Sequence, residues 1–299
     1  MKTPIIVLTG FLGSGKTTLM QHLMDQFREK NGKKVAILVN DFGEIPVDAT
    51  LLSGGELESE MLYEVSGGSI FCACLKDNFI LGLKALLDIE PDLILVEASG
   101  MADPSGISPM LRQAGLTDQC QLMCTLCVFD AIKSLKLAAN LDTIPRQVKG
   151  AHYVLLNKAD LATEAQLGEA KAYIQGTNPG VTLMETVKCR FEVSELAQQM
   201  ENPFALMPSL NTPENRPDTF TVEAITGSVA DFAKTLEAQE ELLRVKGCLV
   251  EDGKPVYISD TGAGIEITPC ETAFSPVVVI TMQGQGESVK ARLEGQGLI

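Results

Sequence analysis

The chain lacks an excess of positive charge: its 299 residues contain 24 lysines and arginines against 39 aspartates and glutamates, a formal net charge of -15. Nucleic acids and anionic membranes bind basic surfaces, so neither is expected as a partner. No uninterrupted apolar run reaches the length of a membrane span. The eight cysteines lack the spacing of a secreted disulfide framework. The apolar residues after Met1 end at Gly10, which is too early for a signal peptide.

A glycine-rich segment at residues 10–18 lies between an apolar run and a helical pattern. A strand end, a glycine turn and a helix N-terminus direct backbone N–H groups and the positive end of the helix dipole to one small volume, which favours a polyphosphate. Lys16 would reach the β- and γ-phosphates, and Thr17 would complete the shell of a Mg²⁺ ion. The predicted nucleotide-binding residues of this segment are Gly10, Gly13, Ser14, Gly15, Lys16, Thr17 and Thr18.

A second motif, Asn157-Lys158-Ala159-Asp160, follows the apolar run 154–156 and predicts guanine recognition. The Asp160 carboxylate can accept hydrogen bonds from guanine N1–H and the 2-amino group, whereas adenine would leave the carboxylate unpaired. Asn157 would bond the base edge or steady the phosphate loop, and the Lys158 stem would lie along the base. The motif ends a strand, where open α/β sheets bind ligands. A GTP-dependent protein needs the cytoplasmic nucleotide pool, so a cytoplasmic location is expected.

The apolar run 92–97 ends in an acid, Glu97. If this strand lies parallel to the one before the phosphate loop, Glu97 comes within reach of the Mg²⁺ shell, so Thr17 and Glu97 are the predicted Mg²⁺ residues. The N–H of Gly100 would bond the γ-phosphate and distinguish GTP from GDP. The residues predicted to carry hydrolysis are Lys16, Thr17, Glu97 and Gly100.

Asp41 and Glu44 follow another predicted strand, 34–39. Their position at a strand end makes them candidate metal or switch groups. A solvated loop is the alternative, and the two carboxylates alone do not decide between them.

The motifs together closely resemble the CobW-like GTPases, relatives of the HypB and UreG metallocentre-assembly proteins. The resemblance rests on residues 10–18, 40–44, 97–104 and 157–160, and residues 243–247 are similar to the family's C-terminal domain. It implies slow GTP hydrolysis and the handling of a transition metal, or help in maturing a metal- or cobalamin-dependent protein.

The family's Cys-x-Cys-Cys motif is incomplete, because residues 67–75 read Gly-Gly-Ser-Ile-Phe-Cys-Ala-Cys-Leu and at least one thiolate is missing. In an extended segment Cys72 and Cys74 project to the same face and could chelate Zn²⁺ or Co²⁺, with Asp41 or Glu44 completing the site. Two small buried side chains are the alternative. The other six cysteines are interpreted as core or edge residues: Cys120, Cys124, Cys127, Cys189, Cys248 and Cys270.

Alternating apolar runs and helical patterns predict an α/β fold, a P-loop NTPase with a mostly parallel central sheet, followed by a smaller α+β domain. The expected domains are 1–205 and 218–299, joined by a proline-rich linker at 206–217. A first helix is expected over 17–29. In the second domain the pattern predicts a helix over 228–244, a hairpin turn at 251–254 and a last strand over 276–282.

Two functions fit this sequence. The first is a GTPase that acts as a metallochaperone or metal-insertion factor for a client metalloprotein or a cobalamin-related protein. The second is a GTP-dependent chaperone that binds such a client without a metal of its own. A small-molecule kinase is disfavoured by the guanine motif. With two histidines in the chain, a high-capacity metal buffer is not expected.

Overall fold

The computed structural model describes residues 2–30, 32–40, 62–65, 76–196, 217–251, 253–260, 264–270 and 276–299. The candidate metal residues Asp41, Glu44, Cys72 and Cys74 lie outside these ranges. The chain forms two compact units, residues 1–212 and 213–299.

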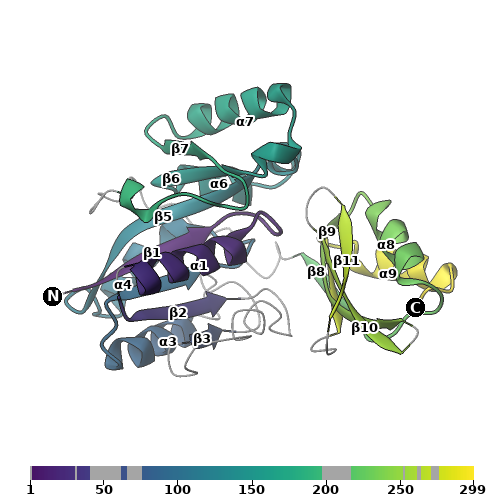
Figure 1. Ribbon diagram of the computed structural model, residues 1–299, viewed down its shortest axis with the longest axis horizontal. Helices are drawn as coiled ribbons and strands as arrows, with labels where there is room; N and C mark the ends of the chain where they lie inside the picture. The colour runs from purple at the N-terminus through teal and green to yellow at the C-terminus, as the bar shows by residue number, and fades with distance from the viewer. Residues whose placement is uncertain are drawn as a thin grey trace. The chain divides into compact units, whose positions relative to one another are not determined.

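The first unit is built on a parallel sheet with the strand order β3-β2-β4-β1-β5-β6-β7 (Figure 1). All its strand pairs in the described residues are parallel, which confirms the predicted α/β fold with a parallel central sheet. The strands are β1 (Thr3–Thr9), β2 (Val35–Asn40), β3 (Leu62–Val65), β4 (Leu93–Glu97), β5 (Cys120–Asp130), β6 (Tyr153–Asn157) and β7 (Thr182–Glu185).

The register brings the ends of four strands to one edge of this sheet. Leu8 of β1 lies opposite Glu97 of β4, and Thr9 lies opposite Cys127 of β5. Farther along β5, Asp130 lies opposite Asn157, the last residue of β6. The polar residues that follow these strands therefore share the edge at which open α/β sheets bind ligands.

Helices cover both faces of the sheet (Figure 1). Ile6 and Leu8 of β1 join a core with α1, whereas Ile5 and Val7 join a second core with α3 and α4, as alternation along a strand requires. The helical elements are α1 (Lys16–Asp25), η1 (Gln26–Lys30), α3 (Lys76–Asp88), η3 (Pro104–Gly106), α4 (Ile107–Gln113), α5 (Ser134–Ala138), α6 (Thr143–Lys149), η4 (Ala159–Leu161), α7 (Glu164–Thr177) and η5 (Val193–Glu195).

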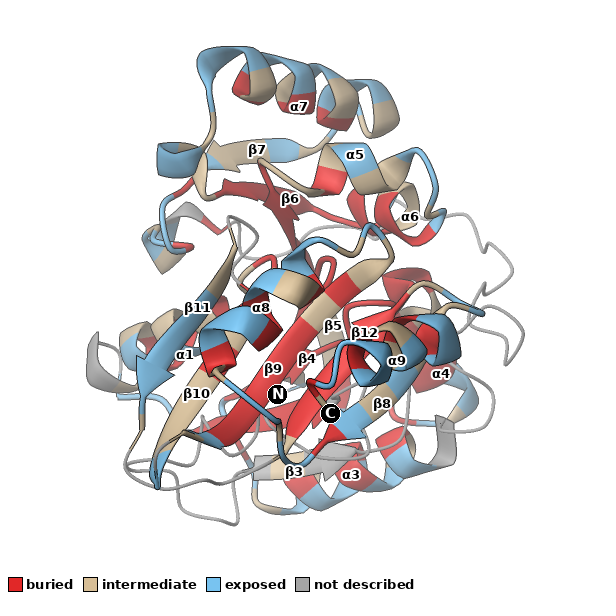
Figure 2. Cartoon of the chain, turned by 90° about the vertical axis from the view of Figure 1, so that its right-hand side faces the viewer, coloured by how far each residue is buried: buried red, intermediate tan, exposed pale blue. Residues whose placement is uncertain are grey.

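The second unit is an antiparallel sheet, in the order β11-β10-β9-β12-β8, with two helices packed on it. Buried residues concentrate in β9 and β12, and β10 and β11 are more exposed (Figure 2). Its elements are β8 (Asp218–Val222), α8 (Val229–Glu237), β9 (Leu242–Glu251), β10 (Lys254–Asp260), β11 (Ile265–Pro269), β12 (Val277–Thr281) and α9 (Gly286–Gly295).

Two element boundaries differ from the sequence-based expectation. The helix expected over 228–244 ends at Glu237, and the following residues enter strand β9, in which Leu243 and Val245 are buried on one side. The first helix begins at Lys16 and changes to a π-helix at Gln26, where the side chain of Gln26 bonds the backbone at Phe191 and Val193. Tertiary contacts override local periodicity in both places.

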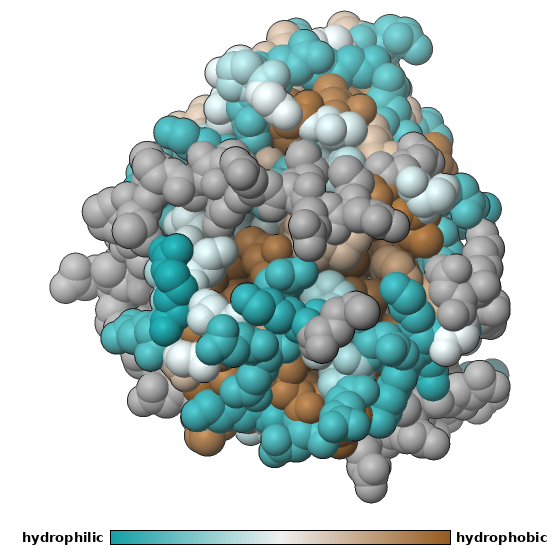
Figure 3. Space-filling view, turned by 90° about the vertical axis from the view of Figure 1, so that its left-hand side faces the viewer, coloured by the Kyte–Doolittle hydropathy of each residue, from teal (hydrophilic) through white to brown (hydrophobic). Residues whose placement is uncertain are grey.

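The surface view in Figure 3 shows mainly hydrophilic side chains, with smaller hydrophobic areas among them. Among the described residues, no helix is both long enough and apolar enough to cross a membrane. Cys120, Cys124 and Cys127 are buried, which confirms their interpretation as core residues.

Candidate nucleotide-binding site

The phosphate loop connects β1 to α1 through glycines with positive φ angles: +133° at Gly10, +73° at Gly13 and +115° at Gly15. Only glycine adopts such angles without strain. A Cβ atom at Gly10 would lie 2.3 Å from the carbonyl oxygen of Val128 in β5. The loop therefore needs glycine for its backbone angles and for its close approach to the neighbouring strand.

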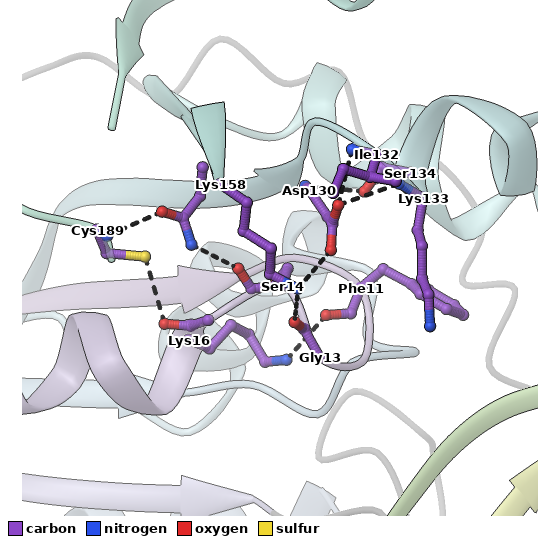
Figure 4. Close-up of polar contacts among 12 residues, drawn as sticks. Phe11, Gly13, Ser14, Lys16, Asp130, Ile132, Lys133, Ser134, Lys158 and Cys189 are labelled. Atoms are coloured by element: carbon purple, nitrogen blue, oxygen red, sulfur yellow. Dashed lines mark hydrogen bonds and ion pairs between the residues drawn. The ribbon is translucent and has the colours of Figure 1, made fainter. Parts of the chain in front are cut away.

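Lys16 is the first residue of α1 and has an exposed fraction of 5%. Its Nζ donates to the carbonyl oxygen of Phe11 over 3.3 Å, so the side chain turns back across the loop (Figure 4). This places a positive charge beside the backbone N–H groups of the loop, which suits a polyphosphate.

Thr17 and Glu97 meet as the sequence predicts. The Thr17 hydroxyl donates to Glu97 Oε1 over 3.2 Å, and Glu97 has an exposed fraction of 3%. A hydroxyl and a buried carboxylate are oxygen ligands of the kind that Mg²⁺ prefers. Among the described residues, the buried hydroxyls of Ser14 and Ser99 have no hydrogen-bond partner, so both can serve a bound ligand. The residues present fit a Mg²⁺–phosphate group.

The guanine motif begins at Asn157, the last residue of β6, and contacts backbone carbonyls of the phosphate loop. Asn157 Nδ2 donates to the carbonyl of Ser14 over 2.8 Å. Lys158 has a left-handed backbone (φ 61°), and its Nζ donates to the carbonyl of Gly13 over 2.8 Å. The Lys158 ammonium also pairs with Asp130 Oδ2 at 2.6 Å. Asp160, in η4, is exposed, so its carboxylate is open to a ligand.

Cys189 belongs to the same site, although no motif predicts it. Its N–H donates to Asn157 Oδ1 over 2.9 Å and its thiol donates to the carbonyl of Gly15 over 3.4 Å. Burial raises the pKa of the Cys189 thiol to about 12, against the opposing effect of Lys158 and Lys16. The thiol therefore stays protonated at neutral pH and acts as a donor. Its only sequence signal is its place after β7, the neighbour of β6.

The segment after β4 is held by helix α6. Gln147 Nε2 donates to the carbonyls of Gly100 and Ala102 over 3.0 and 3.1 Å, and Gln147 is buried. Arg146 pairs with Asp103 at 3.3 Å. Gly100 lies against the phosphate loop, because a Cβ there would come within 2.7 Å of the backbone nitrogen of Leu12. The sequence-based analysis found Gly100 but neither helix residue.

Of the predicted site residues, the structure brings the phosphate loop, Glu97, Gly100, Asn157 and Lys158 to one edge of the sheet. The predicted transition-metal residues lie outside the described ranges. Within those ranges, no group of three or more His, Cys, Asp or Glu side chains is arranged to hold a metal ion. His152 is buried and its Nδ1 accepts the N–H of Thr125, a structural role.

A parallel sheet whose central strand runs through a glycine-rich loop into a helix, with a buried acid beside that helix, defines a P-loop nucleotide-binding protein. Within this class, residues 4–185 match the family described as "CobW/HypB/UreG, nucleotide-binding domain". The chain belongs to this family, whose CobW-like members are P-loop GTPases.

The chain is also similar to individual proteins over most of its length. The chain is 29% identical to the zinc chaperone YjiA of Escherichia coli, over 84% of this chain and 83% of the relative. It is 26% identical to the zinc chaperone CobW of Pseudomonas aeruginosa, over 88% and 81% of the two chains. The crystal structure of zinc-bound YjiA GTPase from E. coli is similar with a TM-score of 0.49, 23% identity and 99% coverage of each chain.

Proposed function

We propose that the chain is a GTP-dependent zinc chaperone, which binds GTP with Mg²⁺, hydrolyses it slowly and delivers zinc to a client metalloprotein. One observation carries this proposal: the phosphate loop and the Asn157–Asp160 motif share one edge of the sheet and are joined by direct hydrogen bonds. The names of the relatives support the choice of zinc.

Guanine specificity is assigned to Asp160. The exposed carboxylate accepts two hydrogen bonds from guanine N1–H and the 2-amino group, and both are charge-assisted. Adenine lacks the 2-amino group and carries no proton on N1, so it would leave the carboxylate desolvated without donors. Such a loss weakens binding by several orders of magnitude in sites of this kind.

For hydrolysis, Lys16 binds the β- and γ-phosphates and Gly100 donates its N–H to the γ-phosphate. Thr17 and Glu97 would hold Mg²⁺, which when bound neutralises charge on the phosphate oxygens. Phosphoryl transfer of this type depends on positioning and charge stabilisation, and Lys16 stabilises the charge that develops as the γ-phosphate leaves.

Zinc is the cargo of the proposed function, and we assign it to Cys72 and Cys74 with Asp41 or Glu44. Two thiolates with a carboxylate form a ligand set that suits Zn²⁺. The client is then a protein with a zinc site of its own. It resides in the cytoplasm, the compartment that supplies GTP.

Competition binding tests the nucleotide assignment. We expect GTP and GDP to displace a labelled guanine nucleotide at concentrations at which ATP does not. Equal competition by ATP and GTP would contradict the assignment of Asp160.

Metal-binding measurements test the assignment of zinc to Cys72 and Cys74. Zinc content and affinity are measured for the wild type and for the double variant Cys72→Ser, Cys74→Ser, each loaded with GDP or with a non-hydrolysable GTP analogue. We expect about one zinc per chain in the wild type, loss of that zinc in the variant, and an affinity that differs between nucleotides. Binding of GTP without zinc would favour the alternative, a GTP-dependent chaperone that holds its client without a metal.

A further inference from the structure

Three consecutive carbonyl groups of the phosphate loop are each held from behind by a different donor (Figure 4). Lys158 Nζ bonds Gly13, Asn157 Nδ2 bonds Ser14, and the Cys189 thiol bonds Gly15, at 2.8, 2.8 and 3.4 Å. We call these donors the rear clamp. Asn157 ends β6, Lys158 follows β6 and Cys189 follows β7, so all three lie on the base side of the site.

Asp130 holds one member of the rear clamp in place. Its side chain is buried, and its Oδ1 accepts the N–H groups of Ile132 and Lys133 at 2.8 and 3.0 Å, which fixes the carboxylate. Its Oδ2 then pairs with the Lys158 ammonium at 2.6 Å. The acid cannot follow a moving lysine, because its other oxygen is anchored to the backbone.

The planarity of the peptide bond gives the rear clamp its effect. In a trans peptide the carbonyl of one residue and the N–H of the next point in opposite directions. The donors on the carbonyls of Ser14 and Gly15, together with the Leu19 N–H of α1, which also donates to the Gly15 carbonyl over 2.9 Å, therefore direct the N–H groups of Gly15 and Lys16 to the opposite side, where a polyphosphate would bind. The N–H of Ser14 is already bonded within the loop, to Phe11.

We propose that Asp130 and Cys189 are positioning residues of the phosphate loop: Asp130 acts through Lys158, Cys189 acts directly on Gly15, and together they preform the anion site before a base is bound. The inference rests on the proposed nucleotide function and deepens it. It implies that even a polyphosphate that carries no base binds with an affinity that depends on Asp130 and Cys189, which lie on the base side of the sheet.

Electrostatics and positioning predict opposite signs for Asp130. If Asp130 were only a negative charge near the anion site, its neutralisation would strengthen polyphosphate binding. If it positions Lys158, its neutralisation releases the lysine and loosens the loop, and binding weakens. Asp130→Asn separates the two effects, since the amide oxygen can still accept the N–H groups of Ile132 and Lys133.

The experiment is calorimetric titration of the full chain with inorganic tripolyphosphate and, separately, with GTP, both with Mg²⁺. We expect Asp130→Asn and Cys189→Ala each to weaken tripolyphosphate binding about tenfold, the effect of losing one contact that positions the loop. Cys189→Ser keeps a donor and should bind as the wild type does. A purely structural role for Cys189 would not predict that rescue.

Two control variants complete the design. Cys124→Ala removes an equally buried thiol from the apolar core of the same sheet and should lower stability without changing tripolyphosphate affinity. Asp160→Ala should weaken GTP binding and leave tripolyphosphate binding unchanged, because its carboxylate is assigned to the base alone.

The outcomes are separable. If the wild type fails to bind GTP, the proposed function fails before the clamp is tested. If the wild type binds GTP but not tripolyphosphate, the loop is not preformed and the inference is wrong. Unchanged or tighter tripolyphosphate binding by Asp130→Asn, together with wild-type binding by Cys189→Ala, would also overturn it.

Discussion

The side-chain amide of Gln147 donates to the carbonyl of Gly100 over 3.0 Å and thereby joins helix α6 to the segment that follows Glu97. A second bond from the same nitrogen reaches Ala102 at 3.1 Å. Because Gly100 also packs against Leu12 of the phosphate loop, a displacement of this segment alters the surroundings of the proposed γ-phosphate site.

We expect Gln147→Ala to slow GTP hydrolysis about tenfold while GTP affinity changes much less. The variant leaves two buried carbonyls without their donor, so its melting temperature should also fall. Single-turnover and binding measurements separate these effects. Lys149→Ala, an exposed change on the same helix, is the control. A lower melting temperature with unchanged turnover would reduce Gln147 to a structural residue.

Substitution of Gly10 should lower the free energy of unfolding much more than substitution of Gly115, another glycine with a positive φ angle. Gly10 and Gly115 have φ angles of +133° and +67°, but only at Gly10 would a Cβ meet backbone, 2.3 Å from Val128 O. We expect Gly115→Ala to cost about 1 kcal/mol and Gly10→Ala about 3 kcal/mol in free energy of unfolding. Equal losses in chemical denaturation would show that the loop relaxes away from β5.

Lys16→Ala should nearly abolish hydrolysis while the protein stays folded. The Lys16 ammonium donates to the carbonyl of Phe11 within the loop itself, and its removal takes the main cation from the transition state. Turnover measurements give the rate of GTP hydrolysis, and circular dichroism shows whether the variant is folded. Turnover at the wild-type rate would exclude Lys16 from the mechanism.

The parts of the site that could be predicted from sequence are contiguous motifs. One is a glycine-rich loop between a strand and a helix, and the other is an Asn-Lys-x-Asp motif at a strand end. In each, the functional groups lie within a few consecutive residues, so residue spacing alone identifies the motif. The pairing of Thr17 with Glu97 also followed, because parallel strands bring their ends to the same edge.

The parts that could not be predicted depend on contacts between segments distant in sequence. Cys189 is 174 residues from Gly15, and Gln147 is 47 residues from Gly100. Neither has a local pattern that differs from an ordinary core residue. Strand β7 could not be predicted for a different reason: Thr182 and Glu185 are exposed and the two residues between them only half-buried, so no apolar run marks it.

Asp160→Asn should shift base preference from guanine toward xanthine. An amide replaces one acceptor with a donor, and xanthine carries a carbonyl where guanine has its 2-amino group, so the donor–acceptor pair is inverted on both sides. Competition with GTP and xanthosine triphosphate measures the preference. If the variant keeps its order of preference, Asp160 does not read the base.

Folding stability should decrease as the pH rises above about 9, because buried thiols resist ionisation. Burial raises the pKa of Cys124, Cys127 and Cys189 from 9.0 to about 12. In the unfolded chain these thiols lose their protons near pH 9.0, whereas in the folded chain they lose them only at about pH 12. The thiols' contribution is therefore complete below pH 9.0 and is lost progressively as the pH rises toward about 12.

Denaturant unfolding at about pH 8 and about pH 10, with a reducing agent present, measures this loss. Tyrosines and lysines titrate in the same range, so the informative quantity is the difference between the wild type and Cys189→Ser, which has no thiol at this position. We expect the variant to lose less stability over the interval than the wild type. An equal loss in both proteins would show that the Cys189 thiol ionises as readily in the folded chain as in the unfolded one.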